Sequence, residues 1–224
     1  MKKFVTIFVA ALFALTTVSY AQNAKDIRKE SEQIKKLSQS ELNAKASKAA
    51  RTEAKRLTKE GWMVAPGALP LEKQLDESYL MQKERDENRL KRYLFGDAMS
   101  IGENYDAAKM QAMELAKLNL AGQIQTEVTS LIDTKVANKQ LAEEQAASVV
   151  QSVMAAKNLI VQSLGRVIPV VETYRIKNNK NKEVRVFIAY RTDMIKETVK
   201  KAIRKDLEER GDELHQKLDE LLGW

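Results

Sequence analysis

Residues 166–191 have the sequence RVIPVVETYRIKNNKNKEVRVFIAYR, and this stretch decides the fold class. In its second half the apolar residues alternate with a period of two, which is typical of a half-buried β-strand. They are Val184, Val186, Ile188 and Tyr190. The polar run 177–182 between two β-rich segments predicts a hairpin turn. Pro169 favours an edge position or a bulged start for the first strand of that hairpin.

Upstream of the hairpin, residues 93–102 (YLFGDAMSIG) are predicted to form another strand, with a bulge or kink at Gly96. Residues 104–139 predict one long helix capped by Asn104 or Asp106. Its expected inner stripe is Ala108, Ala112, Ala116, Leu120, Ile124, Val128 and Leu131. Alanines spaced four residues apart would let this helix approach a sheet closely.

The flanking segments predict further helices, over residues 71–91, 140–162 and from 193 onwards. Residues 25–60 lack Pro and Gly and are rich in strong helix formers. We therefore expect an α+β fold: a small, mainly antiparallel sheet packed against long helices and preceded by an extended helical N-terminal segment.

The first residues have the layout of a secretory signal peptide. Lys2 and Lys3 precede an apolar run over residues 4–18, and Ser19-Tyr20-Ala21 places small residues before Gln22. We expect cleavage at that point and an exported protein, periplasmic or outer-membrane associated. An uncleaved anchor is the alternative. The run is shorter than the ~20 residues of a spanning helix, so no transmembrane span is expected in the mature chain.

The expected organisation has five segments. They are a signal peptide (1–21), a basic helical segment (22–60), an apolar linker and helix (61–91), an α+β domain (92–210) and a C-terminal amphipathic helix (211–224). The basic helical segment holds 11 Lys and Arg against 6 Asp and Glu, whereas residues 61–224 hold 25 of each. This asymmetry favours an anionic envelope surface as partner, or simply a solvated helix. Nucleic acid is a less favoured partner after export.

Self-association is a second prediction for the N-terminal helical region. Residues 25–60 carry a thin apolar stripe made mostly of alanine. Such a helix is weak by itself and needs a partner. It could dock on the same chain, remain extended, or form a homo-oligomer through residues 25–60.

The composition excludes several classes of site. The chain has no Cys and one His, which excludes disulfides, thiolate nucleophiles, Cys-ligated zinc and any site that needs two imidazoles. It also lacks the glycine-rich phosphate-binding motifs. We therefore predict no catalytic, cofactor-binding or metal-binding residues, and not an enzyme. The alternative is a glycan-active enzyme that uses the carboxylates of Asp97, Glu103 and Asp106, which we interpret as turn and cap residues.

Two groups of residues are candidate partner contacts. Trp62 and Met63 lie in an apolar linker that either docks on the core or projects as a binding knob. Lys177, Lys180 and Lys182 form a basic hairpin tip that is either solvated or in contact with an anionic partner.

The pattern over residues 92–210 resembles the Lpp-twenty-type bacterial envelope lipoproteins. It is also similar to the N-terminal domain of the flagellar assembly protein T. The resemblance rests on the Gly-marked strand at 93–102, the alanine-lined helix and the hairpin. It implies a small α+β envelope domain used for association, although the acylated Cys of those lipoproteins is absent here. We therefore predict an exported, non-enzymatic envelope protein that acts as a structural or interaction module, with another envelope protein or an anionic envelope surface as its partner.

Overall fold

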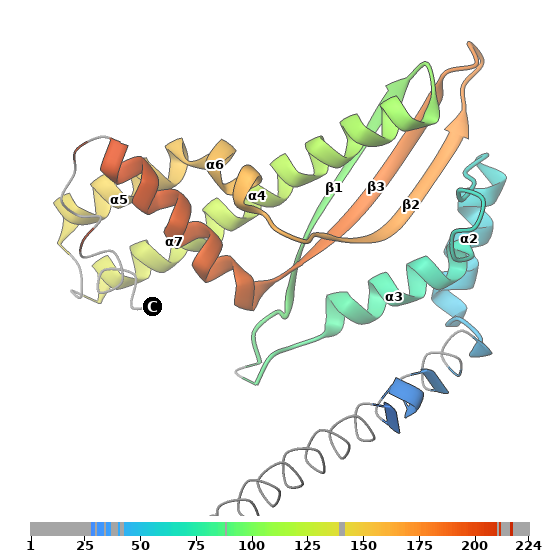
Figure 1. Cartoon of the computed structure of the whole chain (residues 1–224), viewed down its shortest axis with the longest axis horizontal. Coiled ribbons are helices and arrows are strands. Elements are labelled where there is room, and N and C mark those ends of the chain that lie inside the picture. The colour runs from blue at the N-terminus through green and yellow to red at the C-terminus, as the bar shows by residue number, and fades with distance from the viewer. Residues whose placement is uncertain are drawn as a thin grey trace, which may run out of the picture. The chain divides into compact units, whose positions relative to one another are not determined.

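A computed structural model describes residues 43–87, 89–138 and 142–209, and more sparsely residues 28, 29, 31–33, 35, 36, 40, 211 and 216. The chain divides into two compact units, Met1–Lys45 and Ala46–Trp224. The predicted signal peptide and most of the predicted C-terminal helix lie outside the described residues. The predicted basic helical segment is shared between the two units, and the account below concerns the second unit (Figure 1).

Three strands form one antiparallel sheet in the order β1-β3-β2, with β1 at Tyr93–Gly102, β2 at Ile168–Ile176 and β3 at Lys182–Arg191. The register of β1 against β3 runs without a shift, so the expected bulge at Gly96 is wrong. The pairing of β2 with β3 does shift between Pro169 and Val171, which confirms the predicted edge strand with a bulged start.

Helix α4 (Tyr105–Ala137) covers one face of the sheet along β1 and β3. Asn104 caps it, and its side chain accepts a hydrogen bond of 2.9 Å from the backbone N–H of Ala107. Glycine at position 96 is explained by this helix: a Cβ atom there would lie 2.2 Å from the carbonyl oxygen of Ala116. The alanine stripe therefore allows the close approach that the sequence predicted, and Gly96 completes it on the strand.

The second half of α4 extends beyond the sheet and packs against α5 (Glu143–Ala155) and α6 (Lys157–Ser163), and these two helices pack against α7 (Thr192–Glu209), at the end of the domain that Figure 1 shows. The single helix predicted over residues 140–162 is wrong, because the chain interrupts it at Ala156. The predicted inner stripe is confirmed except at its end, where Ile132 is buried and Leu131 is not.

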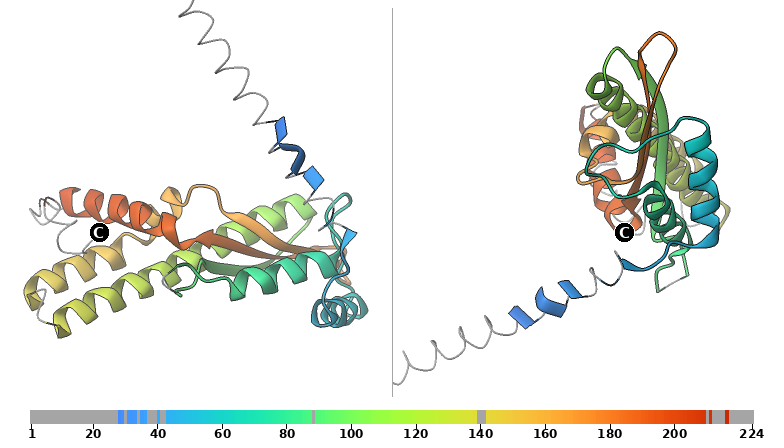
Figure 2. Two further views of the ribbon diagram at one scale, coloured as in Figure 1. Left: turned by 90° about the horizontal axis from the view of Figure 1, so that it is seen from below. Right: turned by 90° about the vertical axis from the view of Figure 1, so that its right-hand side faces the viewer.

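The opposite face of the sheet packs on α2 (Lys48–Lys59) and α3 (Leu71–Lys83), so that the sheet lies between these two helices and α4 (Figure 2). Side chains on this face come from odd-numbered residues of β1 and β3, as the period of two requires. Helix α3 ends at Lys83, not at residue 91 as predicted. Beyond it the Asp86 carboxylate accepts a hydrogen bond of 2.8 Å from the N–H of Leu90, and such local bonds compete with a helix.

Ala49 of α2 is exposed, but the other apolar residues of this helix are buried within the same chain. They are Ala50, Ala54 and Leu57. Self-association through residues 25–60 thus stays a prediction that depends on residues 25–45, about half of which lie outside the described residues. The architecture is the predicted α+β arrangement of a small antiparallel sheet packed against helices. Among the residues that the structure describes, no helix combines the length and the apolar character needed to cross a membrane.

Candidate functional site

The predicted apolar linker folds against the free edge of β2. Met63 and Tyr174 exchange two backbone hydrogen bonds of 2.8 Å, so residue 63 extends the sheet like a strand residue. Successive residues of a strand point to opposite faces. Trp62 is accordingly buried, with its ring 4.6 Å below the guanidinium of Arg175, whereas Met63 is 40% exposed. Of the predicted pair, Met63 is the residue that offers surface to a partner.

The three predicted hairpin lysines differ in their surroundings. Lys177 lies 3.8 Å from the Glu183 carboxylate, which also binds Arg175. Lys180 is exposed at the tip and Lys182 is half-buried. Among the described residues, neither Lys180 nor Lys182 has an ion-pair partner. The pairing of Met63 with Tyr174 brings this tip and the linker to the same end of the sheet.

Helix α2 adds lysines that the sequence analysis did not single out. Lys48, Lys55 and Lys59 follow a spacing of seven and four residues, which places them on one face, opposite the buried face of α2. In the described part of the chain none of the three has an ion-pair partner. Arg56, by contrast, is held by Glu53 and Glu60, and hydrogen bonding to Arg56 lowers the pKa of Glu53.

The C-terminal end of α2 lies beside the hairpin, because Trp62 follows the helix almost directly and stacks under Arg175 of β2. Figure 1 shows α2 and the hairpin tip at the same end of the sheet. We call Lys55, Lys59, Lys177, Lys180 and Lys182 the basic end. The hairpin lysines were visible in the sequence, but only the linker pairing shows that the α2 lysines lie at the same end of the sheet.

The three carboxylates considered for glycan chemistry are all exposed. Asp97 lies on the face of β1 that points away from α4, and Glu103 follows the strand in the turn. Asp106 lies in the first turn of α4. Glu103 and Asp106 thus lie at the predicted turn and helix start, whereas Asp97 lies within β1, so its prediction as a turn or cap residue is wrong.

A half-buried carboxylate, Glu172, is surrounded by donors. It accepts a hydrogen bond from the Tyr105 hydroxyl and forms an ion pair of 2.9 Å with Lys109. The Tyr105 ring packs edge-on against Tyr174, with ring centres 5.2 Å apart. Burial is the main cause that raises the pKa of Tyr105, and the hydrogen bond to Glu172 raises it further. The phenol therefore remains a neutral donor that fastens the start of α4 to β2.

A hollow of about 880 Å³ lies at the end of the sheet away from the basic end. The loop before β1, the start of α7 and the second half of α4 meet there. Its apolar lining comes from Leu90, Leu94, Val128, Leu131 and Ile195. Segments about 100 residues apart in the chain form it, so no local pattern in the sequence indicates it.

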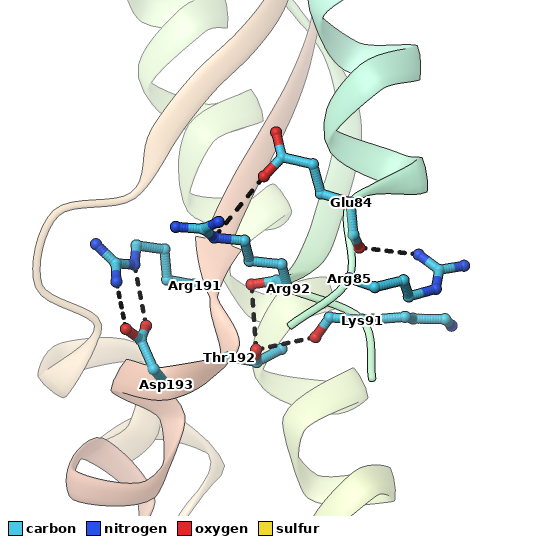
Figure 3. Close-up of polar contacts among 7 residues, drawn as sticks. All are labelled: Glu84, Arg85, Lys91, Arg92, Arg191, Thr192 and Asp193. Carbon is cyan, nitrogen blue, oxygen red and sulfur yellow. Dashed lines mark hydrogen bonds and ion pairs between the residues drawn. The ribbon is translucent and has the colours of Figure 1, made fainter. Parts of the chain in front are cut away.

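Polar contacts beside the hollow join the loop before β1 to the start of α7 (Figure 3). The Thr192 hydroxyl donates to the carbonyl oxygens of Lys91 and Arg92, at 2.9 and 3.1 Å. The Arg92 guanidinium lies 3.7 Å from Glu84, and Arg191 forms a bidentate ion pair with Asp193. Both arginines are therefore occupied within the chain, and these contacts fasten the loop to the start of α7.

Within the described ranges, no three His, Asp or Glu side chains come together where they could hold a metal ion. Comparison with protein-family models, with curated proteins and with solved structures found no match to this chain. What the structure itself defines is an α+β domain with a basic end and a charged hollow. The resemblance to the Lpp-twenty-type envelope lipoproteins stays a prediction.

Proposed function

We propose that the protein is exported and acts at the cell envelope as a non-enzymatic interaction module that attaches to an anionic surface through its basic end. The observation that supports this best is the gathering of Lys55, Lys59, Lys180 and Lys182 without ion-pair partners among the described residues. Exposed apolar side chains border them, with Ile176 55% and Met63 40% exposed.

The chemistry of this surface suits a membrane interface. A lysine close to an anionic lipid surface contributes about 1 kcal/mol to binding, and apolar side chains that enter the headgroup region add to it. Four such lysines give on the order of 4 kcal/mol, which supports reversible attachment. Since exposed charges are screened by salt, the attachment should weaken as ionic strength rises.

Export is the other half of the proposal and rests on the signal-peptide pattern of residues 1–21. N-terminal sequencing of the protein purified from its own host cells tests it. We expect the first residue to be Gln22 or close to it. Material that begins at Met1 would contradict export.

Surface attachment is tested by sedimenting the protein with vesicles of phosphatidylcholine, with and without phosphatidylglycerol. We expect binding only to the anionic vesicles. The variant Lys55→Glu/Lys59→Glu/Lys180→Glu should bind them about a hundredfold more weakly, because each reversal removes an attraction and adds a repulsion.

The matched control is Lys91→Glu/Lys135→Glu/Lys201→Glu, which changes the net charge equally away from the basic end. We expect a loss of no more than about threefold, from long-range charge alone. Equal losses in the two variants would show that net charge rather than the basic end governs binding. Binding to a DNA duplex but not to vesicles, lost in the first variant, would support the nucleic-acid alternative.

A further inference from the structure

The two edges of the sheet differ in how far their backbone N–H and C=O groups are covered. On the β2 edge, Tyr174 pairs with Met63, and the N–H of Glu172 donates to the Gln74 side chain at 2.8 Å. Pro169 and the register shift beside it complete the closure of that edge. No further strand can therefore add along the middle of β2.

The β1 edge lacks these protections. The Asp97 carbonyl accepts a hydrogen bond of 2.7 Å from Asn119 of α4, which shows that odd-numbered residues of β1 direct their backbone groups away from β3. Met99 and Ile101 share this orientation, and the described residues supply no partner for their outward N–H and C=O groups. Strand β1 contains no Pro, no Lys and no register shift.

Apolar side chains border this edge on both faces. On the face away from α4, Met99 is 54% and Ile101 50% exposed. On the other face, Leu115 of α4 is 39% exposed. Leu115 lies on one helical stripe between Gln111, which binds Ser100, and Asn119, which binds Asp97. An added strand would thus meet apolar surface on both of its faces.

Charge identifies the kind of strand that fits. Asp97 and Glu103 stand at the two ends of the free stretch, and within the described residues neither carboxylate has an ion-pair partner. Antiparallel pairing of two copies with Met99 opposite Ile101 would place Asp97 of each copy directly opposite Glu103 of the other, and pairing with Met99 opposite itself would place these carboxylates diagonally across the new edge. Like charges that face each other across strands are destabilising. A second copy is therefore a poor occupant.

We propose that the β1 edge over residues 97–102 binds an extended segment of another protein, with an apolar centre and a basic residue at each end. Main-chain hydrogen bonds to Met99 and Ile101 would hold the segment by β-strand addition. Its basic residues would pair with Asp97 and Glu103, and its alternate side chains would contact Leu115. This surface adjoins the basic end, because Gly102 pairs with Lys182, but the contacts proposed for it need no anionic lipid.

A synthetic peptide tests the proposal directly. The acetylated and amidated peptide Lys-Thr-Val-Leu-Val-Thr-Lys, in an antiparallel register, places its valines opposite Met99 and Ile101 and its lysines opposite the two carboxylates. We expect saturable shifts of the backbone amide NMR signals of Met99 and Ile101 in the full-length protein. Replacing both lysines of the peptide by glutamates should weaken binding about tenfold.

A peptide N-methylated at both valines keeps its composition but cannot donate the edge hydrogen bonds, and we expect it not to bind. Met99→Pro removes only an outward N–H and should abolish binding of the parent peptide. Met99→Lys should weaken it, whereas Met110→Lys, which alters an exposed methionine of α4, should not.

Several results would overturn the proposal. These are no saturable binding of the parent peptide, equal binding of the N-methylated peptide, or shifts confined to residues away from β1. A wild-type dimer that Met99→Pro converts to monomer would show that a second copy occupies the edge instead. If Met99→Pro does not fold, as judged by circular dichroism, the N-methylated peptide still decides the question.

Discussion

Gly96 of β1 lies directly under Ala116 of α4, so close that a Cβ atom on Gly96 would stand 2.2 Å from the Ala116 carbonyl oxygen and 2.9 Å from the Leu120 Cβ. The helix backbone and the strand backbone are thus in contact, with no side chain between them. This pair sets the distance between α4 and the sheet.

Gly96→Ala should therefore destabilise the fold strongly. Because the obstructing atoms belong to backbone, the helix must move as a whole, and we expect a loss of about 3 kcal/mol in the free energy of unfolding. Urea denaturation followed by circular dichroism measures it. Gly165→Ala is the matched control, since a Cβ there meets nothing within 4 Å, and it should change stability by less than about 0.5 kcal/mol.

This contact shows where sequence reasoning succeeds and where it ends. The alanine spacing in α4 predicted close approach to a sheet, and the period of two predicted which face of β3 is buried. Both are local patterns. The role of Gly96 depends on a helix that begins nine residues later, so a glycine within a strand pattern indicated only a bulge.

The end of α2 offers a second test of backbone geometry. Gly61 has φ +86°. Its N–H donates to the Thr58 carbonyl oxygen, and the N–H of Trp62 donates to the Leu57 carbonyl oxygen. These two hydrogen bonds together form the Schellman motif, which favours glycine at the position of Gly61. We expect Gly61→Ala to cost about 1 kcal/mol, measured by urea denaturation. Gly61→Asn should cost less, since Asn tolerates the left-handed region; equal costs would argue against a backbone origin.

Tyr105 provides a test that depends on pH. Its pKa is raised by burial and by the hydrogen bond to Glu172, so the fold favours the neutral phenol. Tyr105→Phe should cost about 1 kcal/mol at pH 7, where the hydrogen bond is fully present. A raised pKa in the folded state means that this contribution persists below the unfolded pKa of about 10 and is lost as pH rises further.

The measurement is urea denaturation of the wild type and of Tyr105→Phe at pH 7, 9 and 10.5. The difference between the two proteins should be constant up to pH 9 and smaller at pH 10.5. A difference that grows with pH would show that the phenol does not serve as a neutral donor.

The parts of the candidate sites were predictable to different degrees. The hairpin lysines and Met63 follow from local turn and linker composition. The gathering of those lysines with α2 could not be predicted, because it depends on the pairing of Met63 with Tyr174, 111 positions later in the chain. The open β1 edge could not be predicted from the sequence either, because the order of strands in a sheet depends on pairing between segments that are distant in the chain.

Gln125 links α4 to α5, and its replacement separates hydrogen bonding from packing. Its buried side-chain amide donates to the carbonyl oxygens of Val153, at 2.6 Å, and Met154, at 3.1 Å. Gln125→Leu removes the donor and should cost about 1–2 kcal/mol. Gln125→Glu keeps the shape but points a carboxylate at two carbonyl oxygens, so it should cost about 3 kcal/mol at pH 7.

The glutamate variant should also gain a pH dependence that the leucine variant lacks. Burial against carbonyl oxygens raises the pKa of the introduced carboxyl group in the folded state, because the protonated form can donate where the ionised form cannot. Stability is then retained below the unfolded pKa of about 4.3 and lost as pH rises through the raised folded value. Urea denaturation from pH 4 to 8 should show the two variants converging at low pH and separating above it. Parallel curves would mean that the introduced carboxyl group reaches solvent and that Gln125 does not hold the two helices together.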